Sequence, residues 1–76
     1  MTKLAPITAY KLMRILQKHG FVVTRKQGSH SFFRHPVSYL TTVVPDHGSE
    51  DIGVGLLRKI LRDIEIDAEE FDKLRR

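Results

Sequence analysis

Residues 21–35 have the sequence FVVTRKQGSHSFFRH, which predicts a β-hairpin around which the rest of the chain is organised. Residues 21–26 are rich in β-branched and aromatic side chains, Gln27-Gly28 is a turn signal, and residues 29–35 resume the extended pattern. Side chains alternate along a strand, so the second strand has two distinct faces. We expect one face to carry His30, Phe32 and Arg34, and the other to carry Ser29, Ser31, Phe33 and His35.

An amphipathic helix is predicted before the hairpin, over residues 7–19. Its apolar positions recur at spacings of three and four, as one buried stripe requires. Thr8 is a possible capping residue, and Gly20 suits the left-handed position that ends a helix. The members of the stripe are Ala9, Leu12, Met13 and Leu16.

A third strand and two further helices are predicted after the hairpin. The pattern of residues 39–44 predicts a third strand that Pro45 stops. The next helix is expected to begin between Ile52 and Gly55, and residues 67–70 have the spacing of a capping box that opens a short final helix. The apolar stripe of the middle helix is Leu56, Leu57, Ile60, Leu61 and Ile64.

This order of elements predicts a single α+β domain over residues 1–76. Three antiparallel strands can bury one face under two helices that each have one apolar stripe. We therefore expect a three-stranded antiparallel sheet with two helices on one face, a short C-terminal helix, and an open opposite face. The α-β-β-β-α order resembles the double-stranded-RNA-binding fold, a similarity of architecture that does not settle function.

Composition narrows the class of partner. Lys and Arg number 13 against 9 Asp and Glu, the formal net charge is +4, and every acidic residue lies at or after Asp46. A cationic first half interleaved with aromatic side chains favours a nucleic-acid partner. The chain has no cysteine, which excludes disulfides and thiolate metal sites. Without a long apolar run we expect no membrane contact and a cytoplasmic location.

His30 is the best candidate for chemistry. It follows the small residues Gly28 and Ser29, and cations flank the turn on both sides, so a phosphate could approach it. Histidine gains and loses a proton near neutral pH, as a general acid or base must. The alternative is a half-exposed packing residue, because a Gly-Ser-His word is weak evidence by itself.

A series of short motifs resembles the HicA toxin family in order and spacing, over nearly the whole chain. They are HGF at 19–21, RKQGSH at 25–30, FRHP at 33–36, TVVPDH at 42–47 and LRKILRD at 57–63. The resemblance implies an mRNA interferase of a type II toxin–antitoxin system in which His30 is catalytic. It also implies a HicB-type antitoxin that covers the catalytic face and provides any contact with DNA.

The chain departs from the pattern of that family in three places. Residues 54–57 are Val-Gly-Leu-Leu where the family usually has a proline before Gly-Thr-Leu, and Glu65 stands where a glycine is common. These two departures concern the ends of a helix. Ser31 replaces a residue that is often bulkier or a second histidine, which would alter contact with the substrate.

The remaining site residues are assigned from charge and position. Candidate RNA contacts are Arg25, Lys26, Ser29 and Arg34, of which Arg34 shares the expected face of His30. His47 is a possible second acid or base. Gly20 and Gly28 are expected to serve backbone conformation, and His35 to pack or cap.

A metal-free reaction fits these residues best, because the sequence offers no compact set of carboxylates and histidines. We expect no metal and no cofactor. The RNA would supply its 2′-hydroxyl as nucleophile, with His30 as base or acid and nearby cations stabilising charge on the phosphorus. The alternative function is a non-catalytic double-stranded-RNA-binding module. A DNA-binding regulator lacks support, since no helix-turn-helix is present.

Overall fold

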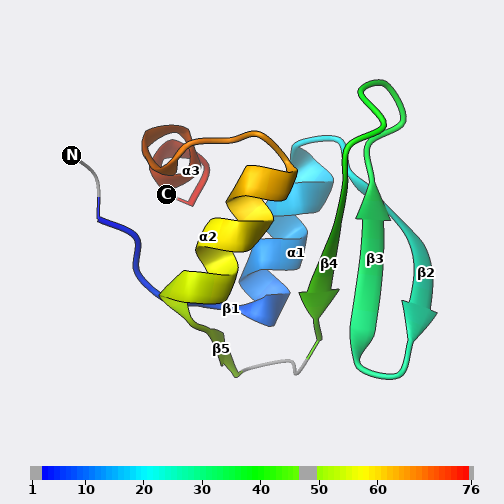
Figure 1. Cartoon of the computed structure of the whole chain (residues 1–76), viewed down its shortest axis with the longest axis horizontal. Coiled ribbons are helices and arrows are strands. Elements are labelled where there is room, and N and C mark those ends of the chain that lie inside the picture. Colours follow the sequence, from blue (N-terminus) through cyan, green and yellow to red (C-terminus); the bar gives the residue numbers. More distant parts are fainter. Residues whose placement is uncertain (1–2, 47–49, 76) are drawn as a thin grey trace.

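The structure, a computed structural model, describes residues 3–46 and 50–75. Its architecture confirms the predicted α+β fold, with three helices and a three-stranded antiparallel sheet in the order β2-β3-β4 (Figure 1). The elements in chain order are β1 (Ile7–Thr8), α1 (Ala9–Lys18), β2 (Val22–Gln27), β3 (His30–Arg34), β4 (Thr41–Pro45), β5 (Asp51–Ile52), α2 (Val54–Asp63) and α3 (Ala68–Arg75).

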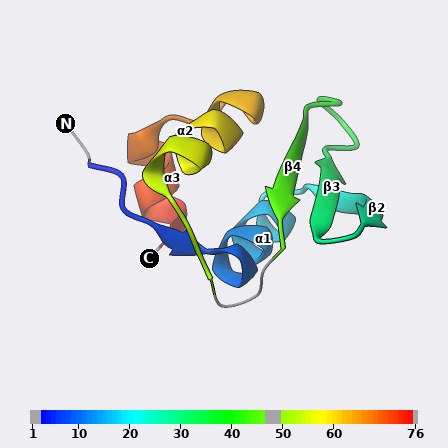
Figure 2. The ribbon, with the colours of Figure 1, turned by 60° about the horizontal axis from the view of Figure 1, so that its bottom comes forward.

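The two long helices cover one face of the sheet and leave the other open. Both α1 and α2 contact β4, and the sheet extends away from them toward β2 (Figures 1 and 2). Every helix and strand except β2 contributes to the core, whose main members are Ile7, Leu12, Leu16, Phe33, Val44, Ile52, Leu57, Ile60 and Phe71. All six residues of β2 are exposed, so this strand projects beyond the cover of the helices.

A two-residue turn joins β2 to β3. Gln27 pairs with His30 across the hairpin, which leaves Gly28 and Ser29 in the turn. Gly28 has φ of 59°, and a glycine with positive φ at the first turn position is the pattern of a type II′ turn. The burial of β3 alternates as predicted, with Ser31 and Phe33 buried and His30 and Arg34 exposed.

A β-bulge in β2 changes which side chains face which way. Val23 pairs with Phe33 but Arg25 pairs with Phe32, so Thr24 is the extra residue. The Thr24 hydroxyl donates to the carbonyl of Phe32 at 3.3 Å. Because of the bulge, Arg25 lies on the open face, although simple alternation from Val23 would direct it toward the helices.

Several expectations about the elements differ from the structure. The first helix begins at Ala9 rather than at residue 7, because Ile7 pairs with Ile52 in a small sheet formed by β1 and β5. Strands of two residues are too short for a period-two pattern, so the sequence did not reveal them. Leu56 is 38% exposed and lies outside the apolar stripe that the sequence predicted for it.

Two side-chain caps form at the residues that the sequence predicted for them. Thr8 Oγ1 accepts from the backbone N–H of Lys11 at 3.2 Å, and Asp67 Oδ1 accepts from the backbone N–H of Glu70 at 2.8 Å. After α2, Glu65 adopts a positive φ of 58°, at the position where the resembled family commonly has glycine. A departure in sequence thus coincides with a backbone conformation that L-residues disfavour.

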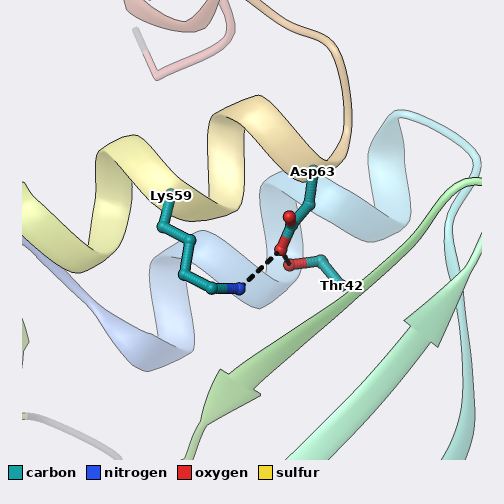
Figure 3. Close-up of polar contacts among 3 residues, drawn as sticks. All are labelled: Thr42, Lys59 and Asp63. Atoms are coloured by element: carbon teal, nitrogen blue, oxygen red, sulfur yellow. Dashed lines mark hydrogen bonds and ion pairs between the residues drawn. The ribbon is translucent and has the colours of Figure 1, made fainter.

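A polar contact joins the end of α2 to β4. The buried Thr42 hydroxyl donates to Asp63 Oδ2 at 3.0 Å, and Lys59 Nζ lies 3.2 Å from the same oxygen (Figure 3). Thr42 faces the helices from β4, so this contact fixes the helical layer against the sheet.

Candidate functional site

His30 is the first residue of β3 and is exposed on the open face of the sheet. Its cross-strand neighbours are Gln27 on β2 and Pro45 on β4. The turn before it contributes only Gly28 and Ser29, so little bulk stands between the imidazole and an approaching ligand. A histidine in this setting can meet a phosphodiester from solvent.

Two arginines on the same face are stacked on aromatic rings. The Arg25 guanidinium lies 4.4 Å from the centroid of the Phe32 ring, and that of Arg34 lies 4.7 Å from the Tyr39 ring. Stacking restricts a guanidinium while leaving its N–H groups available to phosphate oxygens. The open face therefore presents an imidazole and two pre-oriented cations.

Arg25 is the cation nearer to His30. Arg34 is four residues further along β3, about 13 Å away between Cα atoms at the usual rise per residue. Arg25 pairs with Phe32, the next residue on the face of His30. Arg25 is therefore a diagonal neighbour of His30, with about 7 to 8 Å between the two Cα atoms. Arg25 can thus reach a group bound at His30, whereas Arg34 lies too far along the strand to reach the same group.

The structure does not bring Lys26 together with His30. Lys26 pairs with Ser31 and therefore faces the helices, where its Nζ lies 3.2 Å from Asp46 Oδ2. Ser29 is half-buried in the turn, and its carbonyl accepts a hydrogen bond from the backbone N–H of Asp46. His47 lies outside the described residues.

His35 is engaged in packing. Its Nδ1 accepts from the backbone N–H groups of Val37 and Ser38, at 3.1 and 3.2 Å, and its ring meets Phe21 edge to face at 5.1 Å. Its Nε2 lies under Gly20, which has φ of 99°. These contacts stabilise the loop between β3 and β4, on the far side of the strand from His30.

Sequence reasoning missed two partners in the site. Tyr39 has φ of 63° in the loop before β4, and this conformation brings its ring under Arg34. Gln27 carries only a turn signal in the sequence, yet the hairpin register places it directly opposite His30. The positive φ of a tyrosine has no sequence signature, whereas a two-residue turn at Gly28 and Ser29 would have implied the register of Gln27.

Neither a metal centre nor a membrane span is found within the described ranges. No three of the histidine and carboxylate side chains in residues 3–46 and 50–75 converge as a metal site would require. In the same ranges, the helices are too short and too polar to cross a bilayer.

A comparison with protein families gives a match. The family model described as the HicA toxin of bacterial toxin–antitoxin systems matches residues 9–66. The comparison with individual curated proteins found no match. The matched span begins at the first residue of α1, includes the whole of the three-stranded sheet and α2, and ends before α3.

Proposed function

The chain belongs to the HicA family of toxins of bacterial toxin–antitoxin systems, and on this premise we propose that it is an endoribonuclease that cleaves mRNA with His30. The observation that carries the proposal is the exposed imidazole on the open face beside Arg25, which is held over the Phe32 ring. Cleavage of mRNA places the activity in the cytoplasm.

The proposed reaction uses the nucleophile of the RNA. His30 accepts the proton of a ribose 2′-hydroxyl as the hydroxyl oxygen attacks the adjacent phosphorus, and the 5′-oxygen of the next nucleotide leaves and takes up a proton from solvent water. Arg25 donates to the phosphate oxygens as negative charge gathers on them. The products are a 2′,3′-cyclic phosphate and a 5′-hydroxyl, no metal takes part, and DNA is spared.

The partner follows from the family. A toxin of this kind is held inactive by an antitoxin, and we assign that role to a HicB-type protein that covers the open face. Burial of His30 and the two stacked arginines would exclude RNA from the site. Contact with DNA is left to the antitoxin.

The test is RNA cleavage by His30→Ala, with His19→Ala as the matched control because His19 is an exposed histidine at the end of α1. We expect His30→Ala to lose cleavage of a transcript and growth arrest, while His19→Ala keeps both. Product ends are identified by mass spectrometry, in the presence of EDTA. If His30→Ala cuts as fast as the original chain, the proposal is wrong, and folding of each variant is checked by circular dichroism.

The second candidate function is a non-catalytic RNA-binding module, supported by the cationic open face alone. It predicts salt-sensitive binding of duplex RNA with no cleavage over long incubation. Cleavage by the original chain that depends on His30 would exclude it.

A further inference from the structure

A groove lies on the opposite face of the hairpin from His30, between α1 and the helix-facing side of β2 and β3. It has a volume of 770 Å³. Its lining combines an aromatic ring, cations and hydrogen-bonding side chains with apolar side chains, and it includes Tyr10, Arg14, Gln17, Val23, Lys26 and Ser31. We call this the helix-side groove.

The helix-side groove contains a buried polar atom that the fold does not use. Ser31 is fully buried, and its Oγ makes no hydrogen bond to any residue that the structure describes. Buried hydroxyls are nearly always paired, because desolvation without a partner is unfavourable. Ser31 also lines the groove, so a ligand bound there is a candidate partner for this hydroxyl.

The walls of the groove indicate what kind of ligand that is. Tyr10 is 60% exposed, and the Arg14 guanidinium lies 5.9 Å from its ring centroid. A flat exposed ring beside cations suits an unpaired nucleotide, whose base stacks while its phosphate pairs with the cations. Asp46 also lines the groove, and its charge is offset by Lys26 at 3.2 Å.

The groove is connected to the open face across the edge of the sheet. β2 is an edge strand whose residues are all exposed. Because of the bulge, Arg25 lies on the open face of the sheet and Lys26 on the face toward the helices. Adjacent residues thus present cations on both sides of one strand. A single-stranded RNA can pass over this edge and touch both faces within a few nucleotides.

We propose that the helix-side groove binds an unpaired nucleotide of the RNA substrate, with its base against Tyr10 and a hydrogen bond to Ser31. The proposal rests on the proposed function and extends it, since it adds a binding site for the same substrate away from the face of His30. A paired base cannot stack on Tyr10, so duplex RNA gains nothing from the groove.

The test measures binding of a fluorescein-labelled 2′-O-methyl RNA single strand of about ten nucleotides, within the usual range of site sizes. It lacks the free 2′-hydroxyl and therefore stays intact. We expect Tyr10→Ala to raise its Kd about fivefold or more, the loss of one stacked base. Tyr10→Phe keeps the ring and should bind within about twofold of the original chain, because stacking is retained.

Two further variants test the polar contacts. Ser31→Ala should raise the Kd of the single strand about threefold or more, because one hydrogen bond is lost. Arg14→Ala should weaken binding more than its matched control Arg58→Ala, which removes an exposed cation of α2 that does not line the groove. A duplex of the same length should bind Tyr10→Ala and the original chain equally.

The inference is overturned if Tyr10→Ala and Ser31→Ala bind the single strand as the original chain does. It is also overturned if these variants lose affinity for the antitoxin but keep their affinity for the RNA strand, because the groove would then be a protein interface. A different result would contradict the proposed function, namely RNA cleavage by His30→Ala at the rate of the original chain. Each result can occur without the other.

Discussion

Thr42 Oγ1 donates a hydrogen bond of 3.0 Å to Asp63 Oδ2, and this contact joins β4 to the end of α2 (Figure 3). Asp63→Ala should lower the free energy of unfolding by about 1 to 3 kcal/mol, because the buried Thr42 hydroxyl loses its partner. Urea denaturation measures the change. Lys59→Ala is the control, since its exposed ion pair with Asp63 contributes about 0.5 kcal/mol or less.

Ser31 is the other buried hydroxyl side chain of the sheet, and it should behave in the opposite way. Ser31→Ala removes an oxygen that has no partner among the described residues, so the free energy of unfolding should stay level or rise by about 1 kcal/mol. A loss of more than about 1 kcal/mol in urea denaturation would show that the hydroxyl is satisfied.

Glu65 has φ of 58° directly after α2, a conformation that costs an L-residue about 1 to 2 kcal/mol. Glu65→Gly should therefore raise the free energy of unfolding, by about 0.5 kcal/mol after the greater flexibility of glycine in the unfolded chain is subtracted. Glu69→Gly, at an exposed position within α3, should lower it by about 1 kcal/mol. Equal effects at both positions would contradict the role of φ.

Gly20 has φ of 99°, and a Cβ on it would lie 2.7 Å from Nε2 of His35. Gly20→Ala should lower the free energy of unfolding by about 1 to 3 kcal/mol, from backbone strain together with displacement of His35. Gly55→Ala is the matched control. Gly55 lies in α2, and a methyl group added there would meet no atom within 4 Å, so alanine should raise the melting temperature.

Arg25 is held over Phe32 on the face of His30, so its loss should act on catalysis rather than on folding. Arg25→Ala should lower kcat/KM for RNA cleavage about tenfold or more, as expected for a charged hydrogen bond to phosphate. Arg62→Ala removes an exposed cation of α2 and should change it less than about twofold. If the two variants cleave alike, only net charge matters.

The sequence predicted the architecture well because its signals are periodic. The stripe of α1 and the alternation of β3 each repeat often enough to fix which face is buried, and the motif FVVTRKQGSHSFFRH fixed the hairpin. The prediction for Leu56 is wrong because this residue precedes Leu57 in an apolar pair, and here only one of the two adjacent helix positions faces the core.

The site was less predictable because it depends on local irregularities. Arg25 and Lys26 are neighbours in sequence and are both predicted as RNA contacts, yet the bulge at Thr24 determines that Arg25 and not Lys26 shares the face of His30. A bulge reverses the sides of the sheet that the following residues face. It needs no distinctive residue type, so alternation in the sequence alone cannot reveal it. The catalytic role of His30 and the RNA contacts stay predictions.

All six residues of β2 are exposed, so this strand is held less firmly than the rest of the sheet. β4 is clamped between the helices and β3, whereas β2 is held chiefly by its ladder to β3 and by surface contacts such as Lys26 with Asp46. β2 should therefore open locally more often than the rest of the sheet, and its backbone amides should exchange with deuterium faster than those of β4. Under the proposed function, β2 can adjust to an irregular strand of RNA while β4 and the helices keep their positions.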